Sequence, residues 1–235
     1  MNEEELRVII AEYLPQRALK QRGQILYSGI EMLQPGDFYF VGFNPAADGT
    51  NVPLDEISLS RQNWSAYTCQ CWMDRGECKL ASCHNTGQAK HQRNVQHIMK
   101  QLELAPQTTF ATNLMFVESR NISEIKKESR SGLLNCCWQV HKKLLAIIRP
   151  KYIVCLGNGE TDSSFSSFRE RAFGIKGEKL SVEKIGRYFA FKSFVGKFDL
   201  GEGVPLQATV IGVLHPSRWK CPAGLHDFVF DAPPV

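Results

Sequence analysis

The chain of 235 residues alternates between short apolar runs and longer amphipathic stretches. Runs rich in β-branched, aliphatic and aromatic residues predict strands at 37–43, 108–116, 151–156, 187–195 and 206–214. Apolar residues spaced three and four apart predict helices at 3–21, 89–104, 131–148, 163–173 and 223–230.

The order of these elements indicates the fold class. Strands that alternate with helices are typical of a three-layer α/β/α sandwich with a mainly parallel central sheet. The segment at about 46–88 shows little periodicity and carries four cysteines. We therefore expect a single domain over 1–235 with a Cys-rich insertion at about 46–88.

Composition narrows the class of protein. Hydrophobic residues make up 43% of the chain, and the net charge of +4 permits a polyanionic partner without requiring one. The acidic start is unlike a secretory leader, and no apolar run approaches the ~20 residues that span a bilayer. We expect a monomeric, intracellular, cytoplasmic protein with no membrane partner (nucleoid-associated or nuclear if it acts on DNA). Its eight cysteines would then be thiols or metal ligands rather than disulfides.

Polar residues stand at the ends of four predicted strands, namely Asn44, Asn113, Asn158 and His215. The carboxyl ends of parallel strands share one edge of a sheet, and open α/β sheets bind their ligands there. The sequence therefore predicts a cleft at this edge.

The residue types in this cleft favour recognition of a base-like ligand. No serine or cysteine stands beside a base in a nucleophile turn, and Gly157-Asn158-Gly159 lacks the lysine of a phosphate loop. An asparagine side chain offers one acceptor and two donors, which complement a pyrimidine edge. We expect a planar, amide-rich ligand.

Four short motifs at the predicted strand ends share one resemblance. They are Gly42-Phe43-Asn44-Pro45, Ala111-Thr112-Asn113, the run from Arg149 to Gly157, and His215-Pro216-Ser217. In this order they resemble the uracil-DNA glycosylase superfamily, most closely the single-strand-selective and mismatch-specific branches. Those branches begin with a Gly-x-Asn-Pro-Gly turn, and the superfamily's second motif is His-Pro-Ser. The matches cover roughly residues 37–217 and imply the fold of that superfamily.

The resemblance implies a DNA glycosylase of base-excision repair. Such an enzyme binds DNA, flips out uracil or a related deaminated base, and hydrolyses its N-glycosidic bond without a cofactor. Asn44 would position the attacking water, and His215 would stabilise the negative charge on the leaving base. Asn113 would read the base edge, and Gly42 and Ser217 would complete the binding site.

The resemblance also implies contacts to the rest of the DNA. A stacking aromatic is expected in the cleft, with Phe43 and Trp64 as candidates. Beyond the second motif, Arg218 and Lys220 would meet phosphates, and Trp219 would wedge between bases.

The sequence departs from the family pattern at several positions. Ala46 stands where the family has glycine, and no carboxylate occupies the water-activating position of the most active branch, since Asp48 is out of register. The cysteines that hold an iron–sulfur cluster in other branches are absent from their places, so we expect no such cluster.

A group of cysteines in the insertion leaves three interpretations open. Cys69, Cys71, Cys78 and Cys83 lie within fifteen residues, next to His84. They are candidate ligands of a structural zinc, which would hold together a loop that has no core of its own. Free thiols and oxidised pairs are the alternatives.

Two other functions are compatible with the sequence. The chain could be a catalytically weak or inactive superfamily member that binds nucleic acid or a nucleobase, which Ala46 and the missing carboxylate favour. It could instead act through protein interactions of the insertion.

Overall fold

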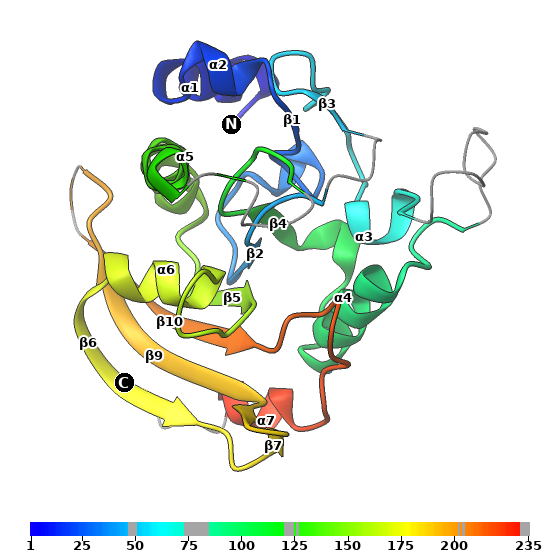
Figure 1. Ribbon diagram of the computed structural model, residues 1–235, viewed down its shortest axis with the longest axis vertical. Coiled ribbons are helices and arrows are strands. Elements are labelled where there is room, and N and C mark those ends of the chain that lie inside the picture. Colours follow the sequence, from blue (N-terminus) through cyan, green and yellow to red (C-terminus); the bar gives the residue numbers. More distant parts are fainter. Residues whose placement is uncertain are drawn as a thin grey trace.

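The computed structural model describes residues 1–46, 51–72, 85–119, 125, 127–201, 203 and 205–230, and its centre is a six-stranded sheet (Figure 1). The strands lie in the order β4-β2-β5-β10-β9-β6. The first four of these run parallel: β4 (Phe110–Asn113), β2 (Phe38–Gly42), β5 (Tyr152–Leu156) and β10 (Leu206–Val213). The remaining two add antiparallel: β9 (Phe191–Phe198) and β6 (Phe173–Leu180). The chain is thus α/β with a mostly parallel sheet, as predicted.

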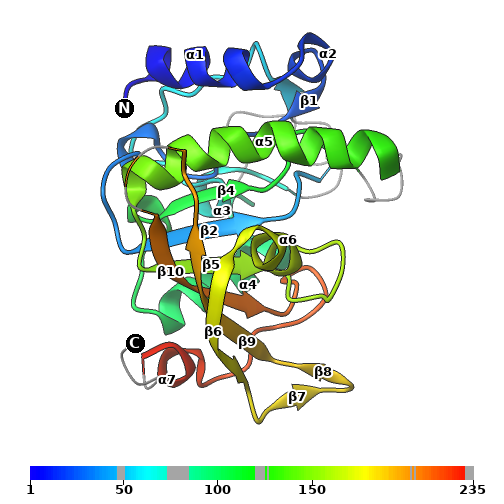
Figure 2. The ribbon, with the colours of Figure 1, turned by 90° about the vertical axis from the view of Figure 1, so that its left-hand side faces the viewer.

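Helices cover both faces of this sheet, because successive strand residues point to opposite sides (Figure 2). Tyr39 and Val41 join one hydrophobic core and Phe40 joins the other. The first core is covered by α1 (Glu3–Tyr13), α5 (Lys127–Ile148) and α6 (Ser164–Arg171). The second is covered by α3 (Ala66–Cys69), α4 (Lys90–Gln101) and α7 (Leu225–Phe230).

Several predicted boundaries were wrong. The helix predicted over 3–21, with an interruption at Pro15, is two helices, because Pro15 lacks the N–H that a continuous helix needs and instead precedes α2 (Gln16–Leu19). The strand predicted over 108–116 is shorter, since η2 (Pro106–Thr108) precedes it. β6 was not predicted at all: it is an edge strand whose residues are mostly exposed, so it shows no apolar run.

The smaller elements lie around the sheet. They are β1 (Arg22–Gly23), which pairs with β3 (Val52–Pro53), then η1 (Ile30–Met32), and β7 (Lys184–Ile185), which pairs with β8 (Tyr188–Phe189). Segment 23–28 also bridges to β4 and the residues after it, which extends the sheet beside β4. This segment therefore borders the carboxyl ends of the parallel strands.

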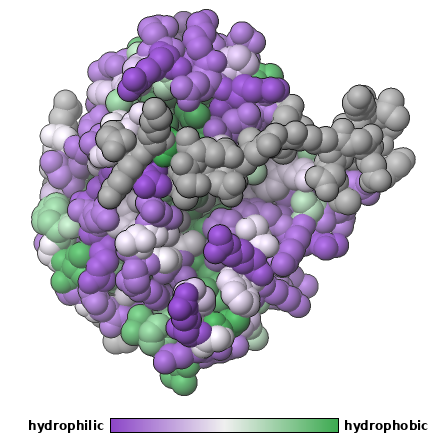
Figure 3. Space-filling view, viewed as in Figure 1, coloured by the Kyte–Doolittle hydropathy of each residue, from purple (hydrophilic) through white to green (hydrophobic). Residues whose placement is uncertain are grey.

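The surface is mostly hydrophilic on the face seen in Figure 3, with hydrophobic residues gathered at its lower edge. Exposed apolar side chains of the β6 to β8 region and α7 include Leu180, Val182, Tyr188 and Phe230. Among the described residues, no helix combines the length and apolarity that crossing a membrane requires.

Candidate functional site

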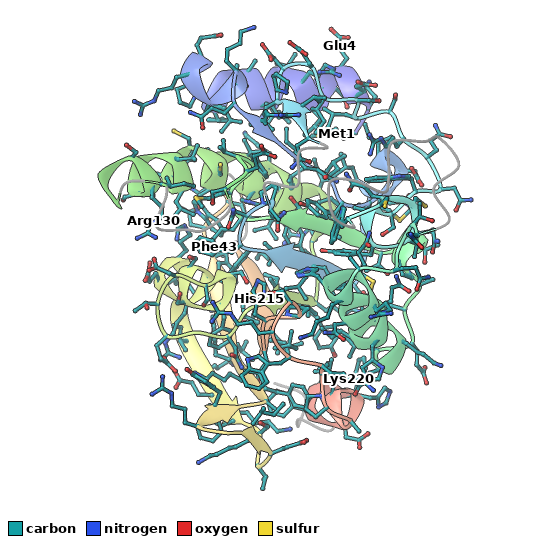
Figure 4. All side chains as sticks on the ribbon, turned by 45° about the vertical axis from the view of Figure 1, so that its right-hand side comes forward. Met1, Glu4, Phe43, Arg130, His215 and Lys220 are labelled. Atoms are coloured by element: carbon teal, nitrogen blue, oxygen red, sulfur yellow. The ribbon has the colours of Figure 1, made fainter. Side chains whose placement is uncertain are left out.

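A cavity of about 340 Å³ opens at the carboxyl ends of the parallel strands. Six residues that the sequence predicted for one site line it together: Gly42, Phe43, Asn44, Asn113, His215 and Ser217. They come from the ends of β2, β4 and β10, which the parallel register brings to one edge. Figure 4 labels Phe43 and His215, which lie in the middle of the molecule between α6 and α4.

The register between β2 and β4 positions Asn113. Gly42 pairs directly with Asn113, and the Asn113 side chain lies over the Cα of Gly42. A Cβ added to Gly42 would stand 2.0 Å from Asn113 Oδ1, so only glycine leaves room for this amide. Asn113 is 5% exposed, and its side chain makes no hydrogen bond to the described residues. Its buried amide is therefore available to a ligand in the cavity.

Asn44 is held by its amide nitrogen. Nδ2 donates to the carbonyl oxygen of Pro45 at 2.8 Å and to Oγ of Ser119 at 3.0 Å. Because these partners are acceptors, the NH₂ group faces them and Oδ1 faces away. The site thus presents Oδ1 of Asn44 as an acceptor, which is the group needed to orient a water molecule.

His215 is held in one tautomer. The backbone N–H of Ser217 donates to Nδ1 of His215 at 3.3 Å, and Ser217 Oγ lies 2.7 Å from the same nitrogen. A backbone N–H can only donate, so Nδ1 carries no proton and the neutral ring carries it on Nε2. Burial and the positive charge of Arg218 lower the pKa of His215 to about 4, which keeps the ring neutral near pH 7. His215 therefore offers a neutral N–H donor.

The cavity is also lined by a second histidine, His91, which the sequence prediction did not place there. The rings of His91 and His215 lie 5.5 Å apart in an edge-to-face arrangement. Burial and repulsion from His215 lower the pKa of His91 to about 3. The missed signal was its spacing, since His91 falls on the same face of α4 as the buried Val95 and Ile98.

Aromatic side chains form the wall beside His91. Tyr27, Tyr67 and Trp72 line the cavity, and their ring centroids lie 5.7 to 5.9 Å from one another. Trp72 also lies 5.6 Å from His91. Tyr27 lies before β2, whereas Tyr67 and Trp72 lie in and just after α3, so no local pattern in the sequence brought all three rings together.

The loop after β10 is fixed to α4. Asn94 Nδ2 donates to the carbonyl oxygens of Pro216 at 2.6 Å and Trp219 at 3.1 Å. Arg218 and Lys220 are exposed on this loop, and Trp219 is half-buried. None of the three lines the cavity, so their predicted contacts would be made outside it.

Two other predictions concern residues at the edge of the site. Trp64 was a candidate stacking aromatic, but it lines a separate hollow, which shares Gln24 and Asn51 with the cavity. Phe43 does line the cavity. Asn158 Nδ2 donates to the carbonyl oxygen of Phe189 at 2.9 Å, so this asparagine ties β5 to the β7–β8 hairpin instead of facing a ligand.

The proposed zinc ligands fall only partly within the described chain. Cys69 is an exposed free thiol, and Cys71 is disulfide-bonded. The disulfide contradicts the expectation of thiols or metal ligands at Cys71 and agrees with the alternative of oxidised pairs. Cys78, Cys83, His84 and also Asp48 lie outside the described residues. Among the described residues, no group of His, Cys, Asp or Glu side chains is arranged to hold a metal ion.

The chemistry of the cavity follows from its lining. The described lining residues include four side-chain amides (Gln24, Asn44, Asn51 and Asn113), two neutral histidines and several aromatic rings, with no carboxylate, lysine or arginine. Such a lining suits a flat, uncharged ligand that both donates and accepts hydrogen bonds. It provides an oriented acceptor at Asn44 and an oriented donor at His215.

Comparison with known proteins adds no family to this description. No protein-family model matches the chain, and no curated protein matches it in sequence.

Proposed function

We propose that this protein is a DNA glycosylase with a uracil-DNA glycosylase-like fold, which hydrolyses the N-glycosidic bond of uracil or a related deaminated base. The observation that carries the proposal is the meeting of Asn44, Asn113 and His215 in one cavity whose described lining carries no carboxylate, lysine or arginine. These are the residues that the motif resemblance assigns to water positioning, base recognition and leaving-group stabilisation.

The fixed hydrogen-bonding groups suit each of these roles. Oδ1 of Asn44 would accept a hydrogen bond from the water that attacks the sugar carbon C1′. The bond from C1′ to the base nitrogen breaks, and its electron pair leaves with the base. Nε2–H of His215 would donate to the base carbonyl oxygen, where the negative charge gathers. The water leaves its oxygen on C1′, and its proton goes to solvent or to the departing base.

The base itself would fit the remaining groups. The Asn113 amide would pair with the ring N–H and carbonyl of a pyrimidine edge, since it has no partner among the described residues. Phe43 and the wall of Tyr27, Tyr67 and Trp72 would cover the flat faces of the ring. The exposed Arg218 and Lys220 would meet the DNA backbone outside the cavity.

Release of uracil from labelled oligonucleotides tests the proposal. The substrates carry one uracil, either in a single strand or opposite guanine in a duplex, and His215→Ala is assayed in parallel. We expect release by the wild type and a loss of release in the variant. No release from uracil, hypoxanthine or xanthine substrates would refute the glycosylase function.

A second candidate function is binding without cleavage. Two observations favour it: Ala46 replaces the family's glycine, and no described residue of the cavity supplies a carboxylate to activate water. Asn44→Ala distinguishes the two functions. It should abolish base release and spare DNA affinity in an enzyme, whereas a binding protein shows no release before the substitution.

A further inference from the structure

A second hollow, of about 70 Å³, adjoins the cavity. Gln24 and Asn51 line both spaces, and they are 5% and 7% exposed. Their own amide hydrogens are used within the protein, since Gln24 Nε2 donates to Leu26 O at 2.9 Å and Asn51 Nδ2 to Glu118 Oε2 at 2.8 Å. Gln24 and Asn51 therefore form a fixed polar partition that both spaces share. A ligand with two linked parts could occupy both.

The hollow carries an arginine that lies over an aromatic ring. The guanidinium carbon of Arg61 lies 4.4 Å from the ring centroid of Trp64, and both side chains line the hollow. The ion pairs of the described residues do not include Arg61. Arg61 is exposed as a residue, but partial burial of its guanidinium lowers its pKa and removes part of its hydration. An anionic group such as a phosphate would compensate for this loss.

The hollow also contains an acceptor without a donor. Oε1 of Gln70 is buried and has no hydrogen-bond partner among the described residues. Gln70 lines the hollow next to Arg61 and Trp64. A buried amide oxygen normally has a partner, so this atom calls for an N–H group on a ligand. Phosphate and N–H groups occur together in a nucleotide.

We propose that this hollow binds the nucleotide adjacent to the one whose base enters the cavity, on a single-stranded nucleic acid. Arg61 binds its phosphate, Trp64 holds the guanidinium plane, and Gln70 Oε1 accepts a hydrogen bond from its base. A single strand is required because a neighbouring base in a duplex is stacked and paired, whereas an unpaired one can reach the protein. This subsite rests on the proposed function, in which the cavity holds a flipped base.

Binding of a fluorescent single-stranded oligonucleotide tests the subsite. The probe carries a non-hydrolysable abasic analogue at its centre, and anisotropy is measured over a range of salt concentrations for Arg61→Ala, Trp64→Ala and Gln70→Leu. Arg149→Ala is the matched control, because Arg149 is an exposed arginine that precedes β5 at the opposite end of the sheet.

We expect Arg61→Ala and Trp64→Ala to weaken binding roughly tenfold. Arg61→Ala should also make the slope of log affinity against log salt concentration shallower by about 0.7, which is the contribution of one phosphate contact on a single strand. Gln70→Leu should weaken binding without lowering the thermal unfolding midpoint, since it removes a buried acceptor that has no partner. Arg149→Ala should bind as the wild type does.

Two outcomes separate failure of the subsite from failure of the glycosylase proposal. If the wild type releases uracil and the Arg61 and Trp64 variants bind the probe with unchanged affinity and slope, the subsite is refuted and the proposed reaction stands. If the wild type binds the probe through Arg61 and Trp64 but releases no base, the subsite is supported and the reaction is refuted.

Discussion

Substitution of Gly42 by alanine tests the geometry of the candidate site most directly. The new Cβ would lie 2.0 Å from Asn113 Oδ1, whereas ordinary contact begins at 3.4 Å, so this amide oxygen has to move by about 1.4 Å. The backbone of Asn113 cannot follow, because it is paired in register with Gly42 in the parallel sheet. The side chain must therefore rotate away from the position in which it faces a ligand.

The expected effects are a large loss of activity and a modest loss of stability. Displacement of a positioning group by about 1 Å costs on the order of 10²-fold in rate. Overpacking of a buried site lowers the free energy of unfolding by about 1–3 kcal/mol, and the better strand preference of alanine offsets a part of this loss. Base release from the uracil oligonucleotide and urea unfolding measure the two effects separately. Affinity for free uracil replaces base release if the protein binds without cleaving.

Two variants control this experiment. Gly132→Ala changes a glycine of α5 whose added Cβ meets nothing within 4 Å, so it should leave base release unchanged and stabilise the helix by about 1 kcal/mol. Gly42→Ala combined with Asn113→Ala should be no slower than Asn113→Ala alone, because the displaced amide is already absent. Wild-type base release by Gly42→Ala would refute the role assigned to Asn113.

Three further predictions follow from the site. His215→Ala and Asn44→Ala should each slow base release by about 10²–10³-fold with DNA affinity retained, and a loss of affinity alone would contradict their roles. Asn94→Ala should lower the free energy of unfolding by about 2 kcal/mol in urea titrations, since two hydrogen bonds to the loop after β10 are lost. Burial lowers the pKa values of His91, His141 and His215 in the folded chain to about 3, 4 and 4, whereas a histidine in the unfolded chain has a pKa near 6.5. Stability should therefore be full above pH 6.5 and fall towards pH 4 by about 1.4 kcal/mol per pH unit for each histidine, and equal urea midpoints at pH 7 and pH 5 would contradict this.

The sequence determined the strands that build the site. Phe38–Gly42, Tyr152–Leu156 and Leu206–Val213 are apolar runs that form buried parallel strands, and polar turns follow them. Because parallel strands bring their carboxyl ends to one edge, the same pattern predicted that Asn44, Asn113 and His215 would meet. These predictions depend only on local apolar pattern and on a general rule of sheet topology.

Only the tertiary structure decided which other side chains join them. His91 and Trp72 reach the cavity because α4 and the segment around α3 pack on the same face of the sheet, whereas Trp64 lines the adjoining hollow. β6 adds to the sheet through backbone hydrogen bonds at an exposed edge, which requires no apolar run. Contacts of this kind join residues far apart in the chain, and the register between β2 and β4 sets the 2.0 Å approach that reserves position 42 for glycine. Local pattern specifies which face of a strand is buried, whereas the packing of whole elements specifies which neighbour each side chain meets.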